Sequence, residues 1–363
     1  MDNTFTPWEV KGDIDYEKLM KDFGISKFAN KPDNLLFRRN IIYGQRDFEK
    51  INDCIKNKKP FVMMTGLMPS GKFHFGHMLV AQQMIFYQQM GAKLYIAVAD
   101  VEAYNTRIAD LEELRKTALE EYLTNYIALG LKPNNCDFYF QSERSTDAKK
   151  SNKYYKLASI AARHVTQNEI EAIYGQVSPG KMSSALLQVS DMLHPQLIEG
   201  PVPTIVPVGF DQDPHIRLAR DIIQRMSQFN FTQLSSTYHK FLPGLKGGKM
   251  SSSDVTSYIA LTDTPEEVAE KIKKHAFSGG RNSLEEHRRL GGIPEIDISF
   301  QYLMCFLEPN DTKLKKIEDE YRSGQLLSGE LKKHTIELMT KFLNHHQKER
   351  EHSKNKIDKF LKN

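Results

Sequence analysis

Residues 61–77 read FVMMTGLMPSGKFHFGH, and this stretch decides the class of fold. Phe61 to Gly66 is a short apolar run that ends in glycine, which is typical of a buried strand followed by a turn. From Gly76 to Met90 apolar residues recur at helical spacing, so a helix follows. A strand that leads through a glycine-containing loop into a helix is the first half of a βαβ unit.

Strands and helices continue to alternate up to about residue 260. The expected strands are Lys93 to Asp100 (KLYIAVAD) and Pro203 to Gly209 (PTIVPVG). The expected helices lie at about Leu111 to Leu129, 151–163, 183–195 and Pro214 to Met226. This alternation predicts an α/β fold whose parallel sheet is covered by helices on both faces.

The pattern changes near residue 260. Thr264 and Glu267 form a capping box with Pro265 at the first helical position, which is a strong helix start, and helices dominate from there on. We therefore expect three parts: an N-terminal extension (1–60), an α/β domain (61–260) with an inserted helical segment (about 145–200), and a helical domain (261–363).

The composition is that of a folded soluble protein. The chain has 363 residues, of which 40% are hydrophobic and 26% charged, and this excludes a disordered or fibrous chain. No apolar run approaches the roughly 18 residues that a membrane span needs, and the N-terminus lacks the features of a signal peptide. Cys54, Cys136 and Cys305 are too far apart to suggest a zinc site or a disulfide framework. We expect a cytoplasmic protein without a bound metal.

The net charge alone does not indicate a nucleic-acid partner. Fifty Lys and Arg against 46 Asp and Glu give +4. Residues 341–363 contain seven Lys and Arg and three Asp and Glu, so this segment holds the whole excess. A solvated terminal helix explains such a charge by itself, so an RNA-facing surface needs other support.

The loop after the first strand carries the most specific motif, HFGH at 74–77. Ligands of open parallel sheets bind beyond the carboxyl ends of strands, and a helix N-terminus favours phosphate. Gly76 lets a nucleotide approach the backbone, while His74 and His77 can face one side and donate hydrogen bonds to a reacting phosphate. Each histidine alone could be an ordinary turn residue, but the combined motif seldom arises by chance.

A second motif is GKMSSS at 248–253, just before the expected helical domain. A lysine on a flexible loop, with small hydroxyl residues beside it, suits a loop that closes on a triphosphate. GKMSS also occurs at 180–184, but there it leads into an apolar helix, so we interpret those serines as helix-start residues. We assign the phosphate role to the later copy.

A third motif, GFDQDP at 209–214, lies where a strand ends and a helix begins. Gly209 allows a ribose to pack against the backbone, and Asp211 can accept hydrogen bonds from ribose hydroxyls. An ordinary helix cap is the alternative for this segment. The sequence contains no Walker A, GxGxxG or GxSxG pattern and no metal-ligand spacing.

HFGH at 74–77 and KMSSS at 249–253 resemble the two signatures of class I aminoacyl-tRNA synthetases, in the right order and at a suitable separation. The finer resemblance is to tryptophanyl-tRNA synthetases of the archaeal and eukaryotic type, and it covers almost the whole chain. The strings that carry it are PWEV (7–10), IDYEKL (14–19), GFDQDPHIRLAR (209–220), KHAFSGGR (274–281), EEHR (285–288) and SGELKK (328–333).

The resemblance implies a Rossmann-type catalytic domain followed by an all-α anticodon-binding domain, in a homodimer. The implied substrates are ATP with Mg²⁺, L-tryptophan and tRNA(Trp). The implied catalytic residues are His74, His77 and Lys249. The implied ATP contacts are Thr65, Gly66, Ser70, His74, Gly76, His77, Gly209, Asp211, Lys249, Met250, Ser251 and Ser252. The implied amino-acid contacts are Met64, Glu102, Gln188, Asp191 and Gln212, with Gln212 between the two sites.

The choice between tryptophan and tyrosine depends on Met64 and on the C-terminal strings. QVSD at 188–191 resembles the specificity helix of both kinds of enzyme, but tyrosine enzymes carry a tyrosine where this chain has Met64. An apolar methionine suits an indole edge, and Asp191 can accept from the indole N–H. Human-like tryptophan enzymes differ too, with tyrosine and glutamine in place of Met64 and Ala97. The alternatives are a tyrosyl-tRNA synthetase, a silent RNA-binding paralogue and a small-molecule nucleotidyltransferase.

Overall fold

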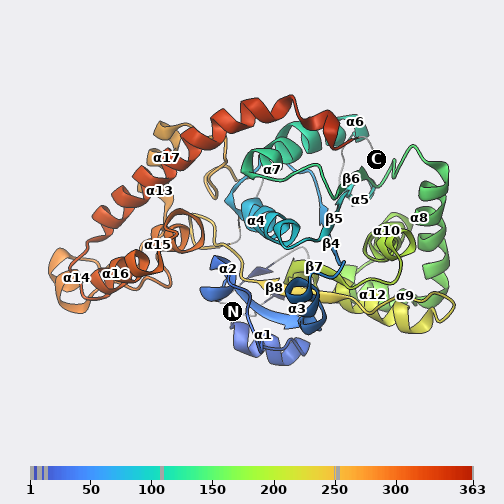
Figure 1. Ribbon diagram of the computed structural model, residues 1–363. Coiled ribbons are helices and arrows are strands. Elements are labelled where there is room, and N and C mark those ends of the chain that lie inside the picture. Colours follow the sequence, from blue (N-terminus) through green and yellow to red (C-terminus); the bar gives the residue numbers. More distant parts are fainter. Residues whose placement is uncertain are drawn as a thin grey trace.

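A six-stranded sheet with the order β3-β8-β7-β4-β5-β6 forms the centre of the molecule (Figure 1). The computed structural model describes residues 4–5, 10–11, 15–106, 110–248, 250 and 254–361. Its strands are β3 (Ile42–Arg46), β4 (Val62–Leu67), β5 (Lys93–Val98), β6 (Cys136–Phe140), β7 (Thr204–Gly209) and β8 (Ser235–His239). Neighbouring strands are parallel, except that β3 runs antiparallel to β8. β1 (Thr4–Phe5) and β2 (Val10–Lys11) pair separately.

The strand order reverses between β4 and β7. The chain moves from β4 to β5 and β6 on one side, and from β7 to β8 on the other. The loops that follow β4 and β7 therefore open at the same point of the sheet edge, which is where open parallel sheets bind their ligands. These two loops contain HFGH and GFDQDP.

Helices cover both faces of the sheet because alternate strand residues point to opposite sides. Met63 and Ile96 belong to one core, whose helices are α3 (Phe48–Asn57), α4 (Phe75–Gln89) and α7 (Thr124–Leu129). Met64 and Tyr95 belong to the other, with α8 (Ala148–Ala161), α9 (Gln167–Tyr174), α10 (Pro179–Leu193) and α12 (Asp213–Arg225). The remaining elements up to β8 are α1 (Tyr16–Phe23), α2 (Leu35–Arg38), α5 (Asp100–Thr106), α6 (Leu111–Thr117), a π-helical segment (Ala118–Leu123), α11 (Pro195–Glu199) and two 3₁₀ turns (Ala162–His164, Phe210–Gln212).

The described part of the chain after residue 264 is helical. Its first helices lie to one side of the sheet, and the long last helix runs back across the molecule and packs against α7 (Figure 1). The capping box predicted there is present, since Thr264 Oγ1 accepts from the Glu267 N–H and the Glu267 carboxylate accepts from the Thr264 N–H. Its elements are α13 (Pro265–His275), α14 (Leu284–Leu290), α15 (Ile298–Tyr302), a π-helical segment (Leu303–Leu307), α16 (Asp311–Arg322), α17 (Ser328–Lys354) and a 3₁₀ turn (Ile357–Lys359). Within the described residues, no helix is both long and apolar enough to cross a membrane.

The structure confirms the predicted α/β fold and most predicted elements. The earlier GKMSS copy lies in the first turns of α10, whose N-cap is Ser178, as its helix-start interpretation required. The proposed division into three parts stays a prediction. β3 and α3, which fall in the range 1–60, join the sheet and its core, so that range is not simply an appendage.

Candidate active site

The HFGH motif forms the start of α4 at the carboxyl end of β4. His74 is the N-cap, and its Nδ1 accepts from the Gly76 N–H at 3.1 Å. His77 reaches back, so that its Nδ1 accepts from the His74 N–H at 3.2 Å. The two rings stack with centroids 3.8 Å apart. The sequence therefore uses each imidazole to satisfy a backbone donor at the helix start, where orphan N–H groups need partners.

These hydrogen bonds fix the protonation of both rings. A nitrogen that accepts from an N–H carries no proton, so the neutral rings hold their protons on Nε2. Burial lowers the pKa of His74 to about 4. Burial and the neighbouring His74 lower the pKa of His77 well below its ordinary value. Near neutral pH the motif therefore holds two neutral Nε2–H donors, and that of His77 faces the Tyr122 hydroxyl at 3.4 Å.

The surroundings of the motif are aromatic and close-fitting. His77 Nε2 lies 3.4 Å from the Tyr122 hydroxyl, which in turn donates to the Ser70 carbonyl at 3.3 Å. A Cβ at Gly76 would lie 2.9 Å from the His74 ring and 3.2 Å from Met250 Sδ. A side chain at position 76 would therefore displace the His74 ring. Met250 brings the second signature beside the first.

The end of β7 supplies the other half of the nucleotide site. A Cβ at Gly209 would lie 2.7 Å from Asp211 Oδ1 and 2.8 Å from the Phe241 ring, so only glycine leaves the backbone open here. Asp211 is buried, and its Oδ2 accepts from Gln212 Nε2 at 3.3 Å. The structure thus brings Gly209, Asp211 and Gln212 together, as the sequence predicts.

The predicted amino-acid residues lie on the face of the sheet covered by α10. Met64, on β4, and Asp191, on α10, are both buried in this part of the molecule. Asp191 Oδ1 accepts from the hydroxyls of Tyr139 and Tyr154, each at 2.8 Å. Its Oδ2 accepts from Gln141 Nε2 at 2.8 Å. Burial raises the pKa of Asp191 to about 6, and the three donors oppose that rise.

A second pair joins α5 to α10. Gln188 Nε2 donates to Glu102 Oε2 at 2.6 Å, and the Glu102 N–H is bound by Gln141 Oε1 at 3.2 Å. Gln141 therefore contacts both the buried carboxylate of Asp191 and the backbone of Glu102. A side chain that sequence reasoning missed thus links the two predicted amino-acid groups.

The remaining predicted residues fall into two groups. Thr65 and Gly66 lie in the last half of β4, which ends at Leu67. The Ser70 N–H donates to the Tyr122 hydroxyl at 3.2 Å. Lys249, Ser251 and Ser252 lie outside the described residues. Tyr122, Tyr139 and Tyr154 lie on a π-helical segment, a strand and a helix that carry no motif, and Gln141 directly follows that strand. None of these four was predicted as a site residue.

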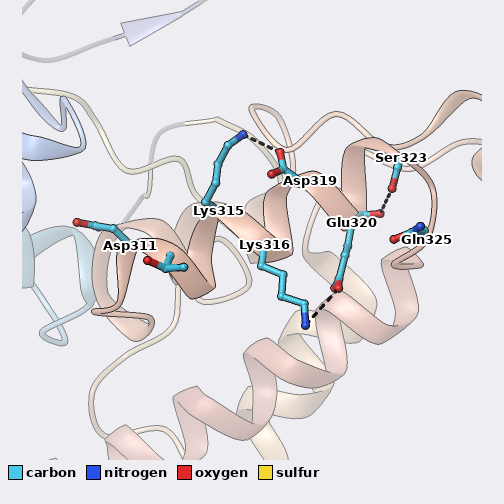
Figure 2. Close-up of a pocket in the computed structure, with 8 residues that line it drawn as sticks. Asp311, Lys315, Lys316, Asp319, Glu320, Ser323 and Gln325 are labelled. Carbon is cyan, nitrogen blue, oxygen red and sulfur yellow. Dashed lines mark hydrogen bonds and ion pairs between the residues drawn. The ribbon is translucent and has the colours of Figure 1, made fainter.

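Two surface hollows lie away from this site. One of about 730 Å³ runs along α16 and is lined mainly by charged side chains, among which Lys315 pairs with Asp319 and Lys316 with Glu320 (Figure 2). Another, of about 650 Å³, lies at the amino ends of β4 and β5. Neither contains a predicted site residue. Among the described side chains, no group of three or more His, Cys, Asp and Glu could hold a metal ion.

A parallel α/β sheet with two histidine donors and a glycine–aspartate turn at its topological switch point defines a nucleotide-binding protein of the open-sheet class. Residues 56–344 match the family described as tRNA synthetases class I (W and Y), and the chain belongs to that family.

Relatives extend this similarity along nearly the whole chain. The Tryptophan–tRNA ligase of Methanocaldococcus jannaschii is 44% identical over 98% of this chain and 97% of its own length. The structure of the tryptophanyl-tRNA synthetase from Aeropyrum pernix superposes with a TM-score of 0.89 at 43% identity, covering 95% of this chain and 96% of that one. The Plasmodium falciparum tryptophanyl-tRNA synthetase gives 0.84 at 30% identity, with 96% and 97% covered.

Proposed function

We propose that this chain catalyses the tryptophan–tRNA ligase reaction. It forms tryptophanyl-adenylate and pyrophosphate from L-tryptophan and ATP, and then transfers tryptophan to tRNA(Trp). The observation that carries the proposal is the match to tryptophan–tRNA ligases, which covers almost the full length of this chain and of each relative. The paired Nε2–H donors at the switch point support ATP as the nucleotide.

In the first step the tryptophan carboxylate attacks the α-phosphate and pyrophosphate leaves. Negative charge grows on the phosphate oxygens, and neutral imidazole donors fixed in place stabilise it without reorganisation. We assign this role to His74 and His77, and we assign the charge on pyrophosphate to Lys249. Positioning and electrostatic stabilisation are sufficient for this reaction, so no protein nucleophile is required.

The other predicted residues bind and orient the substrates. We propose that Gly209 and Asp211 hold the ribose, since glycine leaves the backbone open and the carboxylate accepts from hydroxyls. Thr65, Gly66, Ser70, Gly76, Met250, Ser251 and Ser252 complete the ATP contacts. Glu102 and Gln188 bind the α-ammonium group of tryptophan, and Gln212 lies between the nucleotide and amino-acid sites. Met64 and Asp191 contact the indole.

Further parts of the proposal concern partners and location. Mg²⁺ accompanies ATP, because it binds phosphates with few protein ligands. The helical region after residue 260 binds the anticodon of tRNA(Trp), and two chains form a homodimer. Cys54, Cys136 and Cys305 are free thiols, which supports a reducing cytoplasm.

ATP–pyrophosphate exchange with each standard amino acid, in the absence of tRNA, tests the proposal. Exchange driven by tryptophan alone is the expected result, followed by charging of tRNA(Trp). Exchange driven by tyrosine would overturn the role given to Met64, and absence of exchange from folded protein would favour an RNA-binding paralogue. Lys249→Ala should lower exchange while leaving the melting temperature unchanged.

A further inference from the structure

The long helix α17 joins the helical region to the HFGH loop. It begins where Ser328 Oγ lies 3.0 Å from the Tyr321 hydroxyl of α16, and it runs across the molecule to the segment 118–123 (Figure 1). Its 27 residues, at 1.5 Å per residue, span about 40 Å. The last turns of α17 therefore lie beside the candidate active site, although the first turn of α17 packs far from that site.

On one side, α17 holds the HFGH loop through an ion pair. Arg350 Nη2 lies 3.1 Å from Glu121 Oε1 and donates to the Glu120 carbonyl at 2.8 Å. The second oxygen of Glu121 accepts from the Phe73 N–H at 3.4 Å. The side chains of Arg350 and Glu121 are 14% and 26% exposed, so the pair is largely shielded from water. The residue that it reaches directly precedes His74.

The π-helical segment makes this contact possible. Its wider turn, Ala118–Leu123, presents Glu121 and Tyr122 together toward the loop. Tyr122 contacts Ser70 and His77, and its ring packs on Phe73 with centroids 5.6 Å apart. Any movement of Glu121 therefore moves the groups that surround the second histidine.

On the other side, α17 holds the segment that follows the KMSSS loop. Gln347 Nε2 donates to the carbonyls of Leu261 and Asp263, at 3.1 and 2.9 Å. This segment lies along the motif, since the Leu261 N–H donates to the Phe73 carbonyl at 3.0 Å and the Phe75 N–H donates to the Ile259 carbonyl at 3.4 Å. The backbone of Phe73–Phe75 is thus held from both sides by α17.

We infer that Arg350 and Glu121 are positioning residues of the ATP site: the Arg350–Glu121 pair sets the place of Phe73 and hence of the His74 and His77 donors. The inference rests on the proposed function only for the identity of ATP as ligand. Neither side chain needs to touch the substrate. Their effect on ATP exceeds their effect on tryptophan, because the amino-acid groups lie on the opposite face of the sheet.

Full-length variants test this by calorimetric binding of a non-hydrolysable ATP analogue, followed by exchange kinetics. Arg350→Met should weaken analogue binding about tenfold, the size of one hydrogen-bonded charge, with a smaller effect on the KM for tryptophan. Arg350→Lys should restore most of the affinity because it keeps the ion pair. Lys50→Met, an equal loss of charge at an exposed α3 position, should bind like the parent chain.

Glu121→Gln keeps the shape of the side chain and provides a second variant if Arg350→Met does not fold. The double variant should bind no more weakly than the weaker single one, because the two residues act as one unit. Unchanged analogue affinity in folded Arg350→Met and Glu121→Gln would overturn the inference, as would equal losses for ATP and tryptophan. Binding of the analogue needs no amino acid. Its result therefore tests the positioning residues independently of which amino acid drives exchange.

Discussion

His74 and His77 show how one side chain can serve both folding and chemistry. Each Nδ1 closes a backbone hydrogen bond at the start of α4, and this leaves Nε2–H as the donor that a phosphate can meet. Burial keeps both rings neutral near pH 7. The site therefore stabilises developing charge with dipoles, and the positive charge that a triphosphate also needs must come from elsewhere, for which Lys249 is the proposed source.

The capping and catalytic roles of His74 can be separated by substitution. His74→Asn keeps a good N-cap but loses the Nε2 donor, whereas His74→Ala loses both. We expect both variants to lower the rate of ATP–pyrophosphate exchange about 10²-fold. Only the alanine variant should also lose about 1 kcal/mol of unfolding free energy. Near-normal exchange by His74→Asn would show that the ring acts only as a cap.

Asp191 illustrates a buried carboxylate whose charge depends on its donors. Burial raises its pKa to about 6, while Tyr139, Tyr154 and Gln141 oppose the rise by hydrogen bonding to the ionised form. A carboxylate offers about four acceptor positions, so one position is left for an indole N–H. Tryptophan affinity should accordingly fall as the pH drops through about 6, because protonation removes acceptors.

Tyr154→Phe removes one of the three donors and should make Asp191 easier to protonate. We expect the dissociation constant of tryptophan at neutral pH to rise about threefold to tenfold, and its pH midpoint to move upward. Calorimetric titration of tryptophan across pH measures both. Tyr302→Phe is the matched control, since its buried hydroxyl has no partner among the described residues. A pH midpoint that does not move would argue against Asp191 as the indole acceptor.

At the scale of elements, helices and strands with a strong local sequence signal were predicted, and strands with a weak signal were not. The apolar runs that became β4, β5 and β7, and the capping box of α13, were all readable in the sequence. β8 (SSTYH) and β3 (IYGQR) are polar, short strands, and they are strands because neighbours pair with them. The helix predicted over Leu111 to Leu129 includes the π-helical segment, but helical spacing does not reveal the wider turn, so the roles of Glu121 and Tyr122 beside the motif were not predicted.

The same distinction holds for the candidate site. The motifs with Gly209, Asp211 and the two histidines lie at the switch point, because each motif follows a strand that the sequence predicts. The roles of these residues stay predictions. The donors to Asp191 come from β6, from Gln141 directly after it and from α8, and they lie 37 to 52 residues away in the chain. Only tertiary structure brings such partners together, so local patterns carry no trace of them.

The described part of this basic segment, residues 341–361, lies on α17 and on the chain that follows it. Lys341, Lys348 and Lys354 are exposed, whereas Leu343, His346 and Phe360 are buried. Truncation after residue 341 would therefore remove core as well as charge, so substitution is the sharper test of tRNA attraction.

The triple variant Lys341→Gln, Lys348→Gln, Lys354→Gln should raise the KM for tRNA severalfold and leave exchange without tRNA unchanged. Each lost phosphate contact should lower the slope of log affinity against log salt concentration by about 0.7 to 0.9. A filter-binding salt series on tRNA(Trp) measures that slope. An unaltered KM and slope would mean that these lysines form only a solvated face.

For the molecule as a whole, burial of histidine side chains lowers their pKa values and so makes the free energy of unfolding depend on pH. Burial lowers the pKa of His215 and His239 to about 4, as it does for His74. For His346, burial together with the nearby charge of Arg350 has the same effect. An unfolded histidine has a pKa near 6.5, so between about pH 6.5 and 4 the unfolded chain binds more protons than the folded one. Acid must therefore favour unfolding in that window.

The sign and size of this effect can be stated. Each such histidine should cost about 1.4 kcal/mol of unfolding free energy per pH unit below 6.5, and its contribution levels off below its folded pKa. Asp191 acts in the opposite sense, because its pKa is raised on folding and it takes up a proton first in the folded state. One carboxyl offsets only one of several histidines, so the net slope should stay steep.

Urea unfolding between about pH 7.5 and pH 5 measures the slope before most carboxylates titrate. His239→Asn removes one buried titrating group outside the candidate site, where the ring nitrogen Nδ1 lies 3.2 Å from Gln83 Nε2. That variant should be less stable than the parent at neutral pH, because it disturbs a buried contact. The slope of its unfolding free energy against pH should nevertheless be smaller, by about the contribution of one histidine. An equal slope in the two proteins, or unfolding free energy that rises on acidification, would contradict burial of neutral imidazoles as the cause.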